Sequence, residues 1–440
     1  MDLIVKTGKL RFPKYLVCFQ LIYVCFVQLL ISAGLPSALT LMCDAVNLLL
    51  LFYLIIYNKG TARVMHKYMP FYVIYFLFFM IGTLTALFNG GNLILWLWSL
   101  RNFGRFVVFF TAVLVFIDPK DFKKIKKAVY VIAHLSFVLC AYQFVVKKLK
   151  GDYIGGVFGT TKGPANTYLN VFLVIVFALA LTDWVCRSRG FIHFAVICCE
   201  CIAVAVVGEL KFFFIEMVIV AVICLLLAKK TYKMFSKVLL IVTIGIVLLG
   251  ISVPIMYKMF PSFNDFFHVD TIFKNVTESY TGSGDLGRLT AIPEISTRVF
   301  KGDLGKIIFG IGLGNGEYSD SHRILQSTFY LKYKDINYVW FTDAIVMVQN
   351  GLVGIGLFIM WIVYLAKELF VRFTGKRNNG IMLTAFAVSL ITLFLFVYNI
   401  SLNCEIAYLI YAFLAFGLID PDFMGYNRIR KNRYVLKGDL

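Results

Sequence analysis

The chain has 440 residues, of which 60% are hydrophobic and only 15% are charged. A soluble domain holds about half apolar and about a quarter charged residues, so this composition indicates a polytopic membrane protein and excludes an ordinary soluble fold. A formal net charge of +19 would indicate a nucleic-acid partner in a soluble protein. Here most basic residues fall in short loops on one side of the apolar runs, as the positive-inside rule expects, so nucleic acid is not expected as a partner.

The ten cysteines predict neither a disulfide framework nor a metal site, because all lie within or at the ends of apolar segments. Even the close set Cys198, Cys199 and Cys201 is expected to pack as small hydrophobic residues. The first apolar run follows several basic residues, as in a signal peptide. Its length is sufficient to span a bilayer, so we interpret it as an uncleaved first helix.

Apolar runs of about 17–25 residues, the length that crosses a bilayer, divide the chain into about twelve predicted transmembrane helices. The predicted helices lie near residues 14–33, 37–57, 70–89, 103–117, 129–146, 164–183, 191–208, 211–228, 238–257, 339–366, 381–398 and 404–419. The chain is therefore predicted to be an all-α polytopic membrane protein, with residues 1–440 forming a single membrane domain. The pair at 191–228 is its least distinct part.

Basic segments alternate with poorly charged turns between these helices. The basic segments are the N-terminus and residues 59–67, 120–127, 187–189, 229–237, 367–377 and 428–437. An even number of helices puts both termini on one side, and the basic residues identify that side as the cytoplasm. The polar segment 258–338, between the ninth and tenth helices, is then an extracytoplasmic loop, and residues 420–440 form a cytoplasmic tail.

The long loop contains two glycine-rich stretches, 282–288 (GSGDLGR) and 310–316 (GIGLGNG). Glycines let a backbone turn sharply or approach a ligand closely. Residues 288–301 have the spacing of an amphipathic helix, provided that Pro293 occupies its first turn. Residues 307–309 are predicted to form a short strand or turn.

Charged residues on the predicted outer face are candidates for binding lipid phosphates. Arg101 and Arg105 flank a turn after the aromatic segment 93–100. The lysines of segment 147–150 either bind anions or extend from a helix end toward water. Glu209 and Lys211 lie in a short turn between two apolar helices, where they form a structural ion pair or where Lys211 holds a phosphate.

The long loop and the helix that follows it contain further candidates. Arg288 and Arg298 have the planar fork that suits phosphate oxygens, although a salt-bridged surface arginine is the alternative for Arg298. Asp343 begins an apolar helix, either as a charge that complements the helix dipole or as an acid–base group. His322 is a lone histidine, a pattern more typical of a structural role, and Asp285 lies close to Arg288.

Together these features resemble the O-antigen polymerase and O-antigen ligase superfamily of bacterial envelope glycosyltransferases. The topology, about a dozen helices with one long late outer loop, carries the resemblance over most of the chain. The similar local motifs are residues 159–166, the turn 208–211, SGDLGR at 283–288, FGIGLGN at 309–315 and NGLVG at 350–354. The chain departs from the family where Thr342 and Asp343 stand in place of His-Asn, and where Gln349 replaces an acidic residue.

The resemblance implies a glycosyltransferase of the bacterial cytoplasmic membrane that polymerises undecaprenyl-diphosphate-linked oligosaccharide repeats into O-antigen, capsule or exopolysaccharide. Its expected partners are the lipid-linked donor and acceptor, the bilayer and a chain-length regulator, without a metal or other cofactor. The implied diphosphate ligands are Arg288 and Lys211, followed by Arg101, Arg105 and Arg298. The implied proton acceptor is Asp343, followed by His322, Glu209 and Asp285.

Two other functions remain open at this point. An O-antigen ligase, which transfers finished glycan to lipid A core, shares the fold and nearly every motif. A lipid-linked oligosaccharide flippase is a different class of protein, and a chain of twelve helices also fits it. Transporters usually have related halves and discontinuous helices near the membrane midplane. The concentration of polar residues in one late outer loop favours catalysis at the membrane face.

Overall fold

The computed structural model describes residues 11–227, 284–319, 322–375 and 379–419, together with residues 250, 254 and 258. Throughout these parts the secondary structure is helical, and they contain no strand. Among the described helices, eight are long and apolar enough to cross a membrane, judged by length and composition. These eight are α1 (Arg11–Ser32), α2 (Leu41–Ile56, after the turn Ser37–Thr40), α4 (Met69–Phe88), α5 (Leu93–Phe116), α6 (Pro119–Val145), α7 (Pro164–Val185), α16 (Thr342–Gly375) and α17 (Gly380–Tyr398).

The described helices thus agree with the predicted all-α membrane class but reach eight spans rather than twelve. Two of the predicted spans are shorter helices, α8 (Phe191–Val207) and α18 (Ala407–Leu418), and α9 (Lys211–Leu227) extends to the last residue of its described segment. An additional short helix, α3 (Asn58–Lys67), occupies one of the predicted basic loops. The predicted span 238–257 falls outside the described residues except for positions 250 and 254, and so do most of 258–283 and the tail 420–440.

Two helices begin earlier than predicted because their first turns are capped. The side chain of Asn92 accepts the backbone N–H groups of Ile94 and Leu95, so α5 begins at Leu93. In α6, Asp118 and Asp121 form a reciprocal capping box around Pro119. The prediction of an outer turn at residues 101–105 is therefore wrong, and the two arginines lie inside a span.

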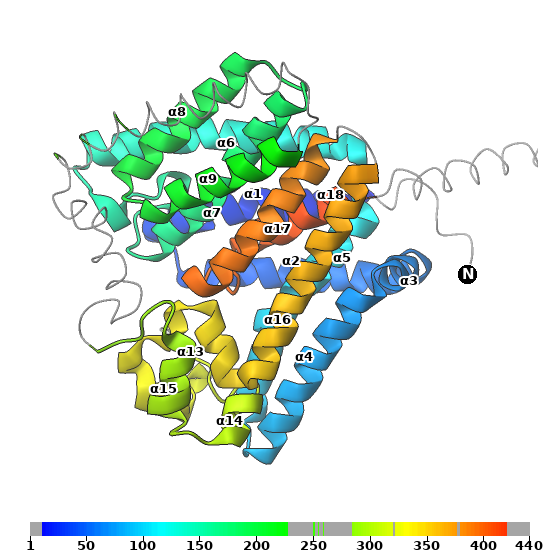
Figure 1. The fold of residues 1–440 in the computed structure, drawn as a ribbon, viewed down its shortest axis with the longest axis vertical. Helices are drawn as coiled ribbons and strands as arrows, with labels where there is room; N and C mark the ends of the chain where they lie inside the picture. Colours follow the sequence, from blue (N-terminus) through cyan, green and yellow to red (C-terminus); the bar gives the residue numbers. More distant parts are fainter. Residues whose placement is uncertain are drawn as a thin grey trace, which may run out of the picture.

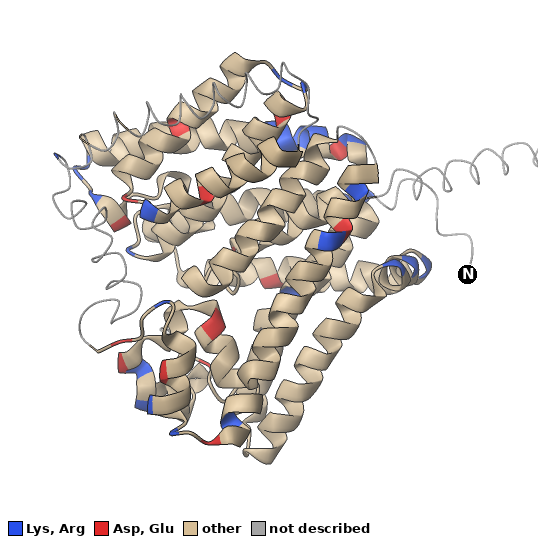
Figure 2. Cartoon of the chain, in the orientation of Figure 1, with Lys and Arg blue, Asp and Glu red and all other residues tan. Residues whose placement is uncertain are grey.

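Two helices fill the interior of the bundle. In α18 every residue is buried, and in α7 nearly every residue is. A helix that is apolar on all sides has no face for water, and here both helices are enclosed by other helices. Figure 1 shows α17 and α18 near the middle, with α6, α8 and α9 toward one side and α4 and α16 toward the other. Charged residues lie mainly at the helix ends and on a small lobe beside α16 (Figure 2).

The lobe comprises residues 284–341 and contains short helices. These are α13 (Ala291–Glu294) with the π-helical turn Ile295–Val299, α14 (Leu304–Phe309) and α15 (Thr328–Tyr333). It packs beside one end of α4 and α16 (Figure 1). The predicted amphipathic helix exists, though shorter. The predicted strand or turn at 307–309 is wrong, because the Asp303 side chain accepts the N–H of Lys306 and caps a helix there.

The second glycine-rich stretch binds the lobe to the membrane helices. The N–H of Gly312 donates to the carbonyl of Gln349 at 2.9 Å, and the N–H of Leu313 donates to that of Gly82 in α4 at 2.9 Å. At Gly351, α16 is broken by a non-helical backbone conformation with φ 64° and ψ −161°. A Cβ atom at Gly351 would lie 2.5 Å from the backbone of Ile308. The glycines therefore bring protein backbones together.

We predict that Gly351→Ala destabilises the protein by about 1–3 kcal/mol, because only glycine adopts this backbone conformation without strain. A Cβ there would also displace Ile308. Gly356→Ala is the matched control, since it lies in the same helix with no atom within 4 Å of the added Cβ. The measurement is the melting temperature of detergent-purified protein by size-exclusion chromatography after heating. Equal melting temperatures for the two variants would contradict the proposed close approach.

Candidate functional site

The ring of Tyr398, the last residue of α17, lies between two groups from distant parts of the chain. The guanidinium carbon of Arg288 lies 3.9 Å from the ring centroid. The ring of Phe212 lies 3.7 Å from the same centroid, with an angle of 10° between the ring planes. Because both distances are below 4 Å, the two groups occupy opposite faces of Tyr398. We call this arrangement the Arg288–Tyr398–Phe212 stack.

The stack brings the first residues of α9 close to the lobe. Lys211 is the first residue of α9 and precedes Phe212. The preceding turn is tight: Glu209 has φ 52°, and the N–H of Lys211 donates to the Glu209 carbonyl at 2.9 Å. The stack thus places Arg288 near the helix end that begins at Lys211. The two predicted diphosphate ligands therefore come from neighbouring parts of the structure. The N-terminal end of α9 adds a partial positive charge at the same place.

Glu209 is half-buried beside this helix end. Its carboxyl group lies over Gly151, where an added Cβ would be 3.0 Å from the Glu209 Cδ. Burial raises the pKa of Glu209, and the neighbouring Asp152 raises it further, while Lys211 opposes the shift. Asp152 in turn accepts a hydrogen bond from Asn166 at the start of α7. A carboxyl group with a raised pKa therefore adjoins one of the candidate cations.

The beginning of α16 contacts Asn399, the residue that follows Tyr398. The backbone N–H and the hydroxyl of Thr342 both donate to the carbonyl of Asn399, at 3.2 and 2.8 Å. The next residue, Asp343, is buried, and its carboxylate accepts the N–H of Ala344 at 2.8 Å. The carboxyl group of Asp343 thus lies in the first turn of α16, close in the chain to the contact with Asn399.

Two other predicted loop residues have clear structural surroundings. Asp285 is buried, and the N–H of its neighbour Leu286 donates to the carbonyl of Ile336 at 3.1 Å. Arg298 is exposed, forms an ion pair with Glu294 at 2.6 Å, and donates to the carbonyl of Gly284 at 3.0 Å. Arg298 is thus a salt-bridged surface arginine in this structure, the alternative considered for it from the sequence. It also binds the backbone of the lobe through the Gly284 carbonyl.

His322 is exposed on the lobe, and its backbone N–H donates to the Ser319 hydroxyl at 3.0 Å. Among the contacts described, none joins it to the other candidate acids and bases. The lysines Lys147, Lys148 and Lys150 are exposed just after α6, where positive charge complements the end of the helix dipole. These residues remain candidates by sequence alone.

Arg101 and Arg105 lie in the interior of α5 and are engaged by carboxylates. Both oxygens of Asp44 in α2 accept from the guanidinium of Arg101. Arg105 is buried and donates to Glu405 at 3.0 Å and to the Asn403 carbonyl at 2.6 Å. Their predicted position at an exposed outer turn is wrong, and their charges are matched within the bundle.

Glu405 is the residue on which this buried ionic cluster converges. Its second carboxylate oxygen accepts the hydroxyl of Tyr168 from α7. Burial alone would raise the pKa of Glu405, but the Arg105 charge and the Tyr168 hydrogen bond outweigh it and hold that pKa below its usual value. Glu405 lies in the linker 399–406 between α17 and α18, so the same linker begins beside Tyr398 and ends at Arg105.

Glu317 joins the lobe to the ionic cluster. Its carboxylate accepts from Gln349 at 3.0 Å and from Asn102 at 2.9 Å, and Asn102 also accepts from Arg101. Burial raises the pKa of Glu317, partly offset by these hydrogen bonds. Sequence reasoning missed Glu317, Glu405 and Tyr398. A glutamate inside the apolar run at 399–410 was a signal for Glu405, since such residues have partners.

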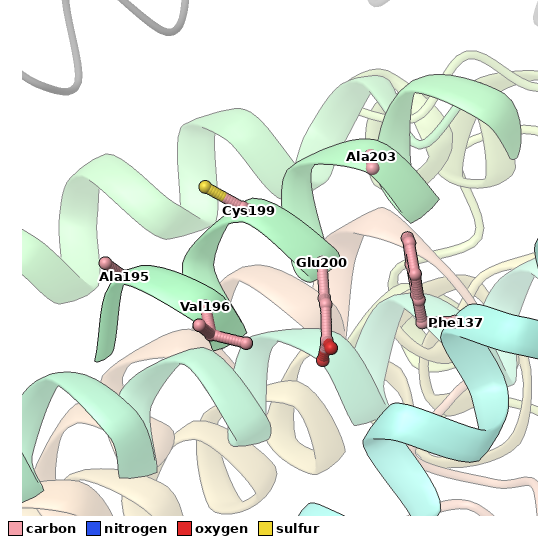
Figure 3. A pocket seen from close by; sticks show the side chains of 6 residues that line it. All are labelled: Phe137, Ala195, Val196, Cys199, Glu200 and Ala203. Atoms are coloured by element: carbon pink, nitrogen blue, oxygen red, sulfur yellow. The ribbon is translucent and has the colours of Figure 1, made fainter. Parts of the chain in front are cut away.

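A shallow hollow of about 420 Å³ lies elsewhere, on the side of α6 and α8 (Figure 3). It is lined by Phe137, Ala195, Val196, Cys199, Glu200 and Ala203. Glu200 pairs with His134 of α6, whose Nδ1 lies 2.8 Å from a carboxylate oxygen. None of these residues belongs to the Arg288–Tyr398–Phe212 stack or to the ionic cluster, so the hollow is separate from the candidate site.

In the described ranges, no group of three or more His, Cys, Asp and Glu residues is placed to hold a metal ion. A scan against protein-family models and a search of curated proteins gave no match. The candidate site consists of two cations, an aromatic ring and several carboxyl groups. They lie at the ends of α9, α16 and α17 and on the adjoining lobe.

We predict that Glu405→Gln destabilises the protein by about 3 kcal/mol near neutral pH, because it removes one partner of a buried ion pair. The pKa of Glu405 is lowered on folding, so its ionised form adds stability above the unfolded value of about 4.3. That contribution is lost as the pH falls through the lower folded value. The difference in melting temperature between wild type and variant should therefore shrink below about pH 4.3.

The control for this series is Asp335→Asn, an exposed carboxylate on the lobe. Its melting temperature should follow that of wild type at every pH. A difference between wild type and Glu405→Gln that stays constant from pH 7 to the acid limit of folding would show that the ionised carboxylate contributes nothing.

Proposed function

We propose that the protein is a bacterial membrane glycosyltransferase that polymerises undecaprenyl-diphosphate-linked oligosaccharide repeats at the outer face of the cytoplasmic membrane. The product is O-antigen, capsule or exopolysaccharide. The observation that carries this proposal is the meeting of Arg288 with the Lys211 end of α9 around Tyr398, at the end of an apolar bundle. A lipid diphosphate presents its charge at this depth of a bilayer, where basic side chains attract it.

The two cations have a defined task in this reaction. A hydroxyl group of the acceptor glycan attacks the anomeric carbon of the donor, a new C–O bond forms, and the bond to the lipid diphosphate breaks. Negative charge then develops on the leaving diphosphate. Arg288 and Lys211, with the N-terminal end of α9, stabilise that charge in the transition state. The planar fork of Arg288 suits two phosphate oxygens at once.

The acceptor hydroxyl must also lose its proton, and we propose Glu209 as the group that accepts it. Asp343 and Asp285 are buried, whereas Glu209 is half-buried and adjoins Lys211. Burial raises the pKa of Glu209, so its carboxylate takes up a proton more readily than that of an exposed glutamate. This assignment changes the order of the sequence-based candidates, in which Asp343 came first.

The packing of the bundle favours catalysis over transport. A flippase for lipid-linked glycan needs a wide cationic route through the membrane, whereas α7 and α18 in the interior are packed and almost wholly buried. The arginines inside α5 are held by Asp44 and Glu405. A ligase that transfers finished glycan to lipid A core fits the same grouping of residues, so the acceptor distinguishes it from a polymerase.

The test uses purified protein with lipid-linked repeat in detergent, read on a gel. A polymerase produces a ladder of products from the repeat alone, and a ligase produces none without core acceptor. A flippase leaves the substrate unchanged, because detergent has no two sides. A substrate that remains unchanged with and without acceptor would refute the glycosyltransferase proposal.

We predict that Arg288→Ala abolishes the ladder, with at least a hundredfold loss of rate, corresponding to about 3 kcal/mol of lost transition-state stabilisation. Lipid-linked single repeats should remain, and expression should be normal. Arg298→Ala is the matched control, since this arginine lies on the same lobe but is exposed and paired with Glu294. Wild-type chain lengths in Arg288→Ala would overturn the assignment of Arg288.

We predict that Glu209→Gln lowers kcat by about 10²–10³-fold with little change in KM, because it removes the proton acceptor without removing a cation. In wild type the rate should rise with pH through the pKa of Glu209, which burial places above the usual glutamate value of about 4.3. The variant should lose this rising limb. If Asp343→Asn removes the limb and Glu209→Gln keeps it, Asp343 is the base instead.

A further inference from the structure

The Arg288–Tyr398–Phe212 stack joins three separate parts of the molecule. Phe212 lies in the first turn of α9, and Tyr398 ends α17, so the two rings are held by helices of the membrane bundle. These two helices also contact each other. Arg288 comes from the lobe, four residues after the lobe begins at residue 284. The lobe thus contributes the arginine, and the bundle contributes the two stacked rings beneath it.

Stacking determines how a guanidinium group presents its hydrogens. The group is planar, and its N–H bonds all point outward in that plane. With the guanidinium carbon 3.9 Å from the centroid of Tyr398, the ring takes one face of the group and leaves its edge directed sideways. Attraction between the cation and the ring face holds this orientation without competing for the in-plane N–H groups. An oxyanion approaching along the edge then meets a fork that already has the right plane.

We propose that Tyr398 and Phe212 are positioning residues, which orient the Arg288 guanidinium to receive the diphosphate of the lipid-linked substrate. This inference rests on the proposed function and goes beyond it, because neither ring touches a reacting atom. Phe212 packs against Tyr398 and is covalently next to Lys211, so the stack brings the backbone that carries the second cation close to the first. The aromatic rings convert two separate basic residues into one diphosphate-binding unit.

The first test compares substitutions that keep or remove the aromatic face, in full-length protein with lipid-linked repeat in detergent. Tyr398→Phe retains the ring and should stay within about twofold of wild type. Tyr398→Leu should lower kcat/KM on the order of tenfold, the scale of a partly desolvated cation–π contact. Equal activity in Tyr398→Leu and Tyr398→Phe would overturn the proposal, and so would an equal loss in both, because only the ring face is assigned a role.

A second test separates positioning from general support of the fold. In the Arg288→Lys background the charge remains, but the planar group is gone. If Tyr398 acts by orienting the guanidinium, Tyr398→Leu should add less than about twofold to the defect of Arg288→Lys, as interacting residues show in double-mutant cycles. Fully additive losses would mean that the ring acts on something other than Arg288, and they would refute the positioning role.

A third measurement does not depend on turnover and so distinguishes failure of this inference from failure of the proposed function. Inorganic pyrophosphate serves as the probe, and the readout is its effect on the melting temperature of the purified protein. Wild type and Tyr398→Phe should be stabilised at the same pyrophosphate concentration, whereas Tyr398→Leu and Arg288→Ala should need on the order of tenfold more. An unchanged requirement in Tyr398→Leu would refute the stack as a diphosphate-binding unit even if the wild-type enzyme makes polymer.

Discussion

The arrangement of this molecule depends on the neutralisation of charge inside an apolar bundle. Arg101 and Arg105 lie within α5, where an unpaired cation would be very unfavourable, and each is met by a carboxylate from another element. Asp44 comes from α2, and Glu405 comes from the linker before α18. Because a buried charge tolerates little displacement of its partner, these contacts fix the relative positions of α2, α5 and the linker. That linker begins immediately after Tyr398, so the ionic cluster also sets the position of the candidate site.

A second constraint comes from backbones that approach too closely for any side chain. The stretch 310–316 runs between α4, α5 and the break in α16 at Gly351. Its backbone N–H groups donate hydrogen bonds to the carbonyls of Gln349 and Gly82. The lobe is consequently attached to the membrane helices by its main chain as well as by Glu317. In the sequence, the same glycines could equally have indicated a loop that closes over a ligand. The structure assigns them to packing of the lobe.

The sequence was sufficient for the class of fold and for most helix positions, because apolar runs and basic loops are strong signals. It failed where local capping mattered: Asn92 extends α5 past two arginines, and Asp118 with Asp121 starts α6 within a lysine-rich segment. The capping box was readable in advance, but the buried arginines were not, since their carboxylate partners are distant in the chain. Arg288 and Lys211 could be identified from the sequence as separate basic residues. Tyr398, which lies between Arg288 and Phe212 in space, carries no local motif.

These points explain why so little of the polar lobe takes part in the candidate site. Of the groups around Tyr398, Lys211, Glu209 and Phe212 belong to the bundle or its helix ends, and Arg288 comes from the lobe. A substrate whose reactive diphosphate is anchored to a lipid needs its binding groups at a fixed depth, and helix ends held by buried ion pairs supply that. Under the proposed function, the lobe contributes one arginine to the diphosphate-binding unit, and the bundle contributes the other groups.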